Sequence, residues 1–149
     1  MDKIGKYQVI RKLGEGATSA VYLCQDPFNN RQVAVKQVHA EALKDPERGH
    51  LYKKLFIAEA SLAGKLTHPH IATIFDAVTE EEEKYIVVEY VNGTTLEKYC
   101  DPASLLPVKT VVEIIFKCTR ALDFAHKVGV THRDIKPANI MVTRRGQAK

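Results

Sequence analysis

THRDIKPANI, residues 131–140, is the stretch of this chain that packing alone explains least well. It places a carboxylate, two cations and an amide close together, at Asp134, Arg133, Lys136 and Asn139. Apolar sequence lies on both sides of it, and charged side chains are rarely buried without partners. We therefore interpret residues 131–140 as a loop that carries chemistry, situated between a helix and a strand.

A long apolar helix is predicted before this loop. Pro107 favours a helix start and Gly129 a helix end, and apolar residues between them cover most of the helix circumference. Such a helix is expected to be buried on several sides. Little chain remains to cover it, so we expect an exposed apolar surface that promotes self-association. That surface would include Val112, Ile115, Phe116 and Ala125.

The first ninety residues predict an antiparallel sheet with one main helix. The predicted strands are residues 7–13, 20–24, 31–38, 71–78 and 84–90. Between residues 45 and 64 the apolar spacing becomes helical, with Leu51, Leu55, Ala58 and Leu62 on one face. Residues 96–99 read as a short helix, and residues 140–143 as a strand followed by a turn at residues 144–147, with no returning strand. The fold class is therefore α+β.

Two glycines interrupt the first hairpin. Gly14 and Gly16 let backbone N–H groups approach phosphate oxygens closely. A strand, and not a helix, follows the glycines, which argues against a dinucleotide-binding loop. A hairpin turn that binds no ligand remains the plain alternative.

A lysine and a glutamate further along the chain favour the phosphate interpretation. Lys36 follows Val33-Ala34-Val35 on a predicted strand, where apolar neighbours make a solvated position unexpected. A buried ammonium group needs an anion, and Glu59 on the predicted helix can supply one. Each residue could be an ordinary surface charge, but the two together are better explained as a pair.

These residues occur in the order typical of eukaryotic-type protein kinases, and the chain resembles that family over essentially its whole length. The resemblance rests on Gly14, Gly16, Val21, Lys36, Glu59 and the run His132–Asn139. Lys136, two residues after Asp134, is typical of the serine/threonine subclass, and the His68-Pro69-His70-Ile71 segment resembles bacterial members. The implied fold is a sheet-based N-lobe over residues 1–92 and a partial helical C-lobe over residues 93–149.

The resemblance also implies roles for single residues, with ATP and Mg²⁺ as ligands and a protein serine or threonine as phosphate acceptor. Asp134 would be the catalytic base, Lys136 would steady the transferring phosphoryl group, and Asn139 would ligate magnesium. Lys36, paired with Glu59, would hold the α- and β-phosphates. The residues implied in nucleotide binding are Leu13, Gly14, Glu15, Gly16, Ala17, Val21, Ala34, Lys36, Glu59, Glu89 and Val91, the last two through backbone groups after the gatekeeper Val88.

The chain departs from the family pattern at two points. Ser19 replaces the third glycine of the loop. This change is mild, because the serine side chain is small. The family also has an Asp-Phe-Gly segment after the strand at Val142, and residues 1–149 contain none. We therefore expect a fragment that binds ATP without transferring phosphate. The alternative function is a non-catalytic nucleotide-binding or regulatory, pseudokinase-like fragment.

Composition argues against several other classes of protein. The formal net charge is +4, but acidic and basic residues are interspersed, so we expect no nucleic-acid binding. Cys24, Cys100 and Cys118 are widely spaced and indicate neither disulfides nor a thiolate metal site. No signal peptide or membrane span is expected, and a cytoplasmic location fits. A metal site built from histidines is a further alternative, using His68, His70, His126 and His132.

Overall fold

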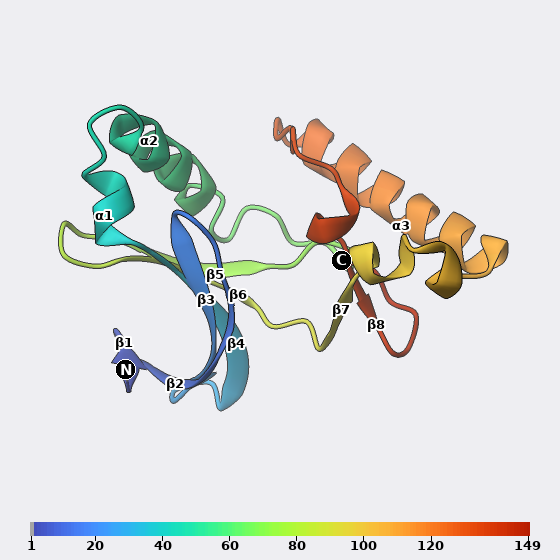
Figure 1. The fold of residues 1–149 in the computed structure, drawn as a ribbon, viewed down its shortest axis with the longest axis horizontal. Coiled ribbons are helices and arrows are strands. Elements are labelled where there is room, and N and C mark those ends of the chain that lie inside the picture. Colours follow the sequence, from blue (N-terminus) through green and yellow to red (C-terminus); the bar gives the residue numbers. More distant parts are fainter. Residues whose placement is uncertain (1) are drawn as a thin grey trace. The chain divides into compact units, whose positions relative to one another are not determined.

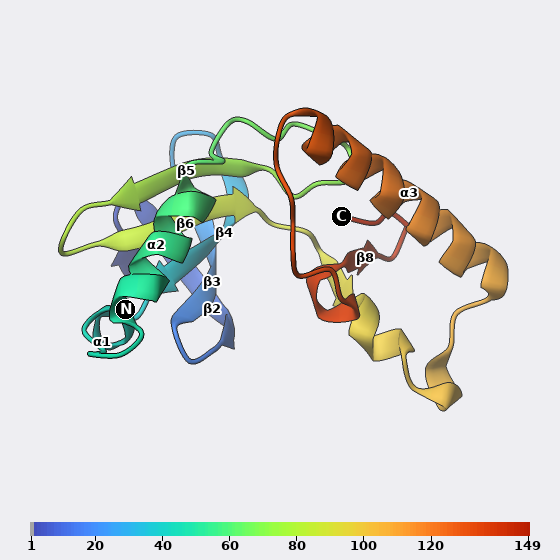
Figure 2. The same cartoon turned by 90° about the horizontal axis from the view of Figure 1, so that it is seen from above.

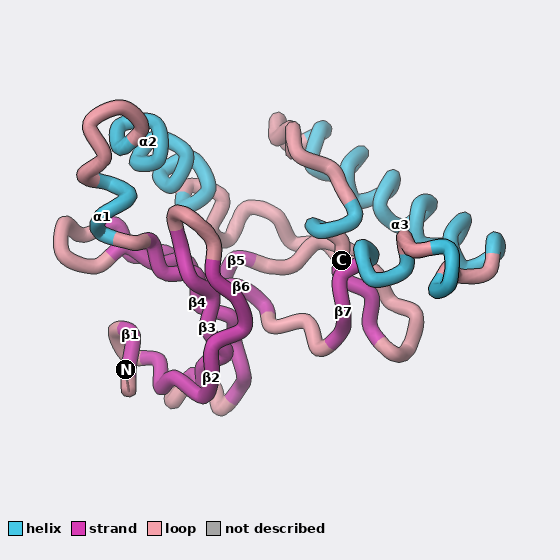
Figure 3. The backbone as a smooth tube through the Cα atoms, viewed as in Figure 1, coloured by secondary structure: helices cyan, strands magenta, loops and turns pink. Residues whose placement is uncertain are grey.

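The structure is a computed structural model that describes residues 2–149, and the chain divides into two compact units. The first unit contains the chain up to Leu66 together with Thr73–Tyr90. The second contains Thr67–Ala72 and Val91–Lys149. Strands dominate the first unit and a long helix the second, as the colours of Figure 3 show. No helix within residues 2–149 is long and apolar enough to cross a membrane.

The first unit is built on a six-stranded antiparallel sheet with the order β1-β2-β3-β4-β6-β5 (Figure 1). Its strands are β1 (Lys3–Ile4), β2 (Tyr7–Glu15), β3 (Ser19–Asp26), β4 (Arg31–Val38), β5 (Ile74–Thr79) and β6 (Lys84–Glu89). The predicted meander is therefore present. β2 continues through Gly14, which pairs with Val21 after a register shift that follows Lys12. The glycines thus lie at the strand end, and the turn itself is limited to Gly16–Thr18.

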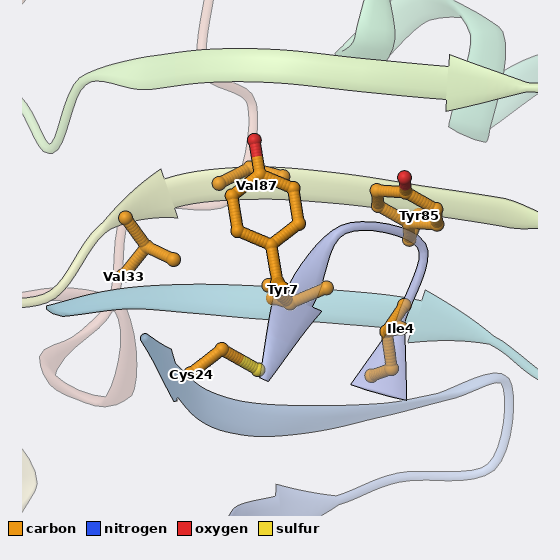
Figure 4. Packing of buried hydrophobic residues seen from close by; sticks show 7 residues of the cluster. Ile4, Tyr7, Cys24, Val33, Tyr85 and Val87 are labelled. Atoms are coloured by element: carbon orange, nitrogen blue, oxygen red, sulfur yellow. The ribbon is translucent and has the colours of Figure 1, made fainter. Parts of the chain in front are cut away.

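One face of this sheet forms the larger core. The buried residues on it are Ile4, Tyr7, Cys24, Val33, Val35, Tyr85 and Val87. Figure 4 shows most of these side chains between the strands, with Tyr7 and Tyr85 meeting edge to face at 6.3 Å between ring centres. Because side chains alternate across a strand, the intervening residues of β3 and β4 are left for the opposite face.

Two helices follow β4, namely α1 (Ala40–Leu43) and α2 (Gly49–Ala60). α2 lies alongside β5 (Figure 2). It is shorter than the predicted helix because the Asp45 carboxylate accepts the N–H groups of Glu47 and Arg48, both at 2.8 Å, which holds a turn before it. The predicted apolar face was wrong: Leu51 and Leu55 are exposed, and Phe56 is the buried side chain.

The second unit is organised around α3 (Val108–Lys127), which ends as predicted near Gly129. Gly129 has a φ of 83°, and the N–H groups of Gly129 and Val130 bond to the carbonyls of His126 and Ala125. This double bond pattern is the Schellman helix end that glycine favours. Shorter elements complete the unit: β7 (Gly93–Thr95), η1 (Leu96–Tyr99), η2 (Pro102–Ser104), η3 (Pro137–Asn139) and β8 (Met141–Thr143).

Only one face of α3 is buried among the described residues. Ile114, Ala121 and Ala125 lie on that face at helical spacing, and Ile114 packs with Ile140, Val142 and Ala148. Ala125 is 6% exposed, so its predicted place on the open apolar surface was wrong. The remaining members of that prediction, Val112, Ile115 and Phe116, are exposed as expected.

The chain after β8 also differs from the prediction of no returning strand. Thr143 N–H donates to Gln147 O at 2.9 Å, and Met141 and Lys149 exchange two backbone hydrogen bonds. Gly146, with a φ of 73°, makes the turn that brings this segment back. β8 also pairs on its other side with β7, so it is covered on both edges.

Candidate active site

The first unit contains one group of candidate site residues, which begins with the glycine loop, defined here as Gly14–Val21. Gly16 N–H donates to Ser19 O at 2.8 Å and closes the turn. Neither Gly14 nor Gly16 has a positive φ. A Cβ atom on Gly14 would meet nothing within 4 Å, and one on Gly16 would come no closer than 3.8 Å, to Ser19 O. Nothing in the chain therefore requires glycine here, which fits a loop that admits another molecule at close range.

Two strands place side chains on the sheet face opposite the larger core. Val21 lies across from Lys36 in the β3–β4 pair, and Lys36 lies across from Ile86 in the β4–β6 pair. Ala34, two residues before Lys36, shares that face and is 7% exposed. The register thus places Val21, at the end of the glycine loop, beside Lys36, on the same sheet face as the apolar residue Ala34. Leu13, Glu15 and Ala17 of the predicted set are exposed on β2 and at the turn.

Lys36 and Glu59 form the ion pair that the sequence predicted. Lys36 Nζ lies 2.9 Å from Glu59 Oε2, so α2 and β4 are tied together at this point. The expected burial was wrong: the two side chains are 36% and 39% exposed. A pair with this much solvent contributes roughly 0–1 kcal/mol to stability. Its main effect is to fix the position of the ammonium group.

Glu89 and Val91 fall on different units. The N–H of Glu89 donates to Thr73 O at 2.8 Å, and its side chain accepts the Thr73 N–H at 3.2 Å. The Glu89 N–H is therefore already hydrogen-bonded within the first unit. Any contact of Glu89 with adenine would have to be made by a backbone group other than this N–H. Val91 is the first residue of the second unit's main segment and is half-buried.

The second unit contains its own group of candidate site residues, the loop His132–Asn139, where three predicted catalytic residues meet. Asn139 Nδ2 donates to Asp134 O at 2.9 Å and to Asp134 Oδ2 at 3.1 Å. Lys136 Nζ lies 3.5 Å from the same Oδ2. Within residues 2–149 no hydrogen bond reaches Asp134 Oδ1. The carboxylate is 65% exposed, so these two neighbours, and not packing, set its direction.

His132 was named from the sequence only as part of the family run and as a possible metal ligand, and the structure shows what it does in this loop. Its Nδ1 accepts the N–H of Asp134 at 3.1 Å, which fixes the backbone that carries the carboxylate. The same contact recurs where His68 Nδ1 accepts the N–H of His70 at 3.0 Å. The usable signal in the sequence was a histidine two residues before the aspartate. Short polar side chains at this spacing commonly hold the backbone two residues on.

Arg133, between them, has a left-handed backbone with a φ of 68°. For a residue with a side chain this conformation costs of order 1–3 kcal/mol, and such residues cluster at functional sites. The turn at Arg133 brings His132 and Asp134 into contact. The strained backbone at Arg133 and the hydrogen bond between His132 and Asp134 thus belong to the same turn.

Asn139 is the residue here that fits a divalent cation. Because its amide nitrogen donates twice to Asp134, its oxygen Oδ1 is directed elsewhere, and oxygen is the ligand that magnesium prefers. The histidine alternative finds no support in the structure. Among the described residues, no three histidine, cysteine or acidic side chains gather as a metal site requires.

Sequence comparisons relate the chain as a whole to known proteins. The family model described as protein kinase domain matches residues 7–149. A probable serine/threonine-protein kinase of Streptomyces coelicolor is 39% identical over 97% of this chain, and the serine/threonine-protein kinase PrkC of Bacillus subtilis is 37% identical over 97%. The chain spans about a fifth of the length of these relatives, 22% of each.

Solved structures give the same result for the fold. The crystal structure of the Mycobacterium tuberculosis PknI kinase domain matches 96% of this chain with a TM-score of 0.77 and 32% identity. This chain covers 58% of that structure. The sheet with its paired lysine and glutamate, and the loop with its aspartate, thus occur here within a fold already seen in a kinase domain.

Proposed function

Because this chain belongs to the protein kinase domain family, we propose that the protein transfers the γ-phosphoryl group of ATP to serine or threonine hydroxyls of a protein substrate. The observation that carries the proposal is the cluster around Asp134. An exposed carboxylate has one oxygen held by Lys136 and Asn139, and its other oxygen accepts no hydrogen bond from the described residues. That arrangement suits a group that must orient and accept the proton of an incoming hydroxyl.

The first unit supports the ATP part of the proposal. Lys36 is held by Glu59 and places a fixed positive charge beside β3, the strand in which the glycine loop ends. Phosphoryl transfer needs little covalent chemistry from the protein, and its rate depends mainly on positioning and on neutralising charge. We assign Lys36 to the α- and β-phosphates, and Ala34 and Val21 to the apolar contacts of adenine.

Magnesium is the cation we assign to this site. Asn139 would hold it through Oδ1, and the bound ion would neutralise charge on the phosphate oxygens. Lys136, 3.5 Å from Asp134, would carry its positive charge to the phosphoryl group in transfer. Asp134 would take the hydroxyl proton on Oδ1. We also assign the protein to the cytoplasm, where ATP is the abundant phosphate donor.

ATP binding tests the first half of the proposal. Calorimetry on the 149-residue chain should show binding that is stronger with magnesium and is reduced at least tenfold in Lys36→Ala. Lys53→Ala is the matched control, since Lys53 is an exposed lysine of α2. Equal affinity in Lys36→Ala and the unsubstituted chain would contradict the assignment of Lys36.

Phosphate transfer tests the second half, and it is measured on the natural gene product. Incorporation of labelled γ-phosphate into a test protein should fall at least a hundredfold in Asp134→Asn, the scale of losing one catalytic acid–base group. Glu97→Gln, an exposed carboxylate in η1, should leave the rate unchanged. Phosphate transfer that persists in Asp134→Asn would contradict the assignment of Asp134 as the catalytic base. ATP binding with no transfer by the gene product would favour the non-catalytic alternative.

A further inference from the structure

His39 lies against the tip of the glycine loop, directly after β4. Its backbone N–H donates to Thr18 O at 2.8 Å. Its ring Nε2 lies 3.3 Å from Gly16 O and 3.7 Å from Glu15 Oε1. The side chain is 33% exposed. One residue therefore contacts Glu15 at the end of β2 and both Gly16 and Thr18 in the turn that follows.

The chemistry of these contacts sets the proton on the ring. A carbonyl oxygen only accepts hydrogen bonds, so the bond to Gly16 O requires a hydrogen on Nε2. The Glu15 carboxylate approaches the same nitrogen and favours the same form. Glu15 is itself paired with Lys12, and that hydrogen bond, with a smaller effect from His39, lowers the pKa of the Glu15 carboxyl. The ring is thus placed on the loop by one hydrogen bond, to Gly16 O, with the Glu15 carboxylate 3.7 Å from the same nitrogen.

The ring of His39 has no competing task in the adjoining helix. His39 occupies the N-cap position of α1, but its side chain makes no capping hydrogen bond there. Its carbonyl accepts the N–H of Ala42 at 3.1 Å, which begins α1. His39 therefore connects the glycine loop, through its ring, to the segment that leads into α2 and Glu59.

Holding a carbonyl also fixes the next N–H group. The peptide bond is planar and trans, so the N–H of Ala17 points opposite to the Gly16 carbonyl, and the N–H of Ser19 opposite to the Thr18 carbonyl. Because His39 binds both carbonyls, it directs both N–H groups away from itself. These groups lie in the loop assigned to cover the phosphates, and backbone N–H groups are effective ligands for phosphate oxygens.

We propose that His39 is a positioning residue for the phosphates of ATP, acting by orienting the backbone of the glycine loop. This inference rests on the proposed function, since it concerns the same nucleotide site. The plainer alternative is that His39 only stabilises the hairpin. The two differ in their ligand dependence, because a phosphate-positioning residue affects ATP and not adenosine.

The experiment compares ATP and adenosine binding in variants of the 149-residue chain. His39→Ala should weaken ATP binding about threefold to tenfold, the range expected for one lost hydrogen bond, and change adenosine binding less than twofold. His39→Leu, which keeps a bulky side chain without a donor, should behave in the same way. His39→Gln should recover ATP binding, because its amide nitrogen can donate to Gly16 O. His50→Ala, an exposed histidine of α2, is the control.

Several outcomes would overturn the inference. ATP affinity that is unchanged in His39→Leu, or an equal loss for ATP and adenosine, removes His39 from phosphate positioning and leaves the proposed function standing. Failure of His39→Gln to recover any affinity would show that hydrogen-bond donation is not the cause. An unsubstituted chain that binds adenosine and ATP equally, or neither, would overturn the proposed function together with this inference.

Discussion

The charged residues of the candidate site are positioned by hydrogen bonds more than by burial. Asp134, Lys136 and the Lys36–Glu59 pair all keep a third or more of their side chains in contact with solvent. In such places each contact is weak, so direction depends on several contacts acting together. Three residues hold Asp134: His132 at its N–H, Asn139 at its carbonyl and carboxylate, and Lys136 at its carboxylate. The site is therefore sensitive to single substitutions that leave the fold intact.

Asp26 shows the contrasting case of a carboxylate that serves the fold. It ends β3, is 1% exposed, and accepts the Asn29 side chain at 2.6 Å and the Phe28 N–H at 3.0 Å. These bonds, that of Asn29 being the largest cause, lower the pKa of Asp26 below its ordinary 3.8. The deprotonated form is thus the one that stabilises the turn before β4.

A carboxyl whose pKa is lowered by folding contributes stability that is complete above its ordinary pKa. That contribution is lost as the pH falls below 3.8 toward the folded pKa. We expect the urea midpoint of the unsubstituted chain to fall over this acid range, and Asp26→Asn to show a smaller fall from a lower starting point. The exposed Glu41→Gln is the control. An unchanged acid dependence in Asp26→Asn would contradict the prediction.

At the scale of elements, α3 separates the buried from the exposed apolar residues of the second unit. Ile114 is 1% exposed and its neighbour Ile115 is 52% exposed. Truncating a buried isoleucine removes apolar contacts and leaves a cavity, at a cost of about 2–5 kcal/mol. Truncating an exposed one changes stability by about 0.5 kcal/mol or less. The two adjacent positions therefore form a matched pair.

We expect Ile114→Ala to lower the free energy of unfolding by about 2–5 kcal/mol and Ile115→Ala to leave it nearly unchanged. Urea titration followed by circular dichroism measures both free energies. The comparison is valid if the free energy of unfolding falls with urea concentration at the same slope in the two variants. A similar loss in both would mean that Ile115 is covered in solution. That result would support association through this face of α3.

The same elements show how far the sequence could predict the structure. Alternating residues predicted the strands at Tyr7, Val33 and Tyr85, because a half-buried strand repeats every two residues. The helix near Leu55 was predicted but its face was not, since several apolar residues surround its circumference and only the partner sheet selects Phe56. β1, with two residues, is too short for any periodicity. The return of the chain at Gln147 depends on backbone pairing, which side-chain patterns do not record.

The candidate site also contains some features that the sequence could predict and others that it could not. The pairing of Lys36 with Glu59 was predictable, because a lysine among apolar residues needs an anion nearby. The role of Asp134 stays a prediction. The contacts of His39 with the glycine loop were not predictable, because they use the backbone carbonyls of Gly16 and Thr18. Every residue has such a carbonyl, so the sequence carries no signal for which one a histidine will reach.

At the scale of the whole molecule, the exposed apolar residues of α3 predict how the chain behaves in solution. Val112, Ile115 and Phe116 are 61%, 52% and 61% exposed, and they lie together on one helix. Contiguous apolar surface of this kind favours association, because each contact removes apolar area from water. We expect the 149-residue chain to form dimers or larger species as its concentration rises, through this face of α3.

Phe116→Glu should shift light-scattering mass toward the monomer at a given concentration, because a carboxylate at the centre of the patch opposes its burial. Phe28→Glu is the matched control: Phe28 is 77% exposed in the first unit, outside the patch, so its loss should leave association unchanged. Circular dichroism should show that both variants keep their helix and strand content. A monodisperse monomer at high concentration for the unsubstituted chain, or equal effects of the two substitutions, would rule out this face as the site of association.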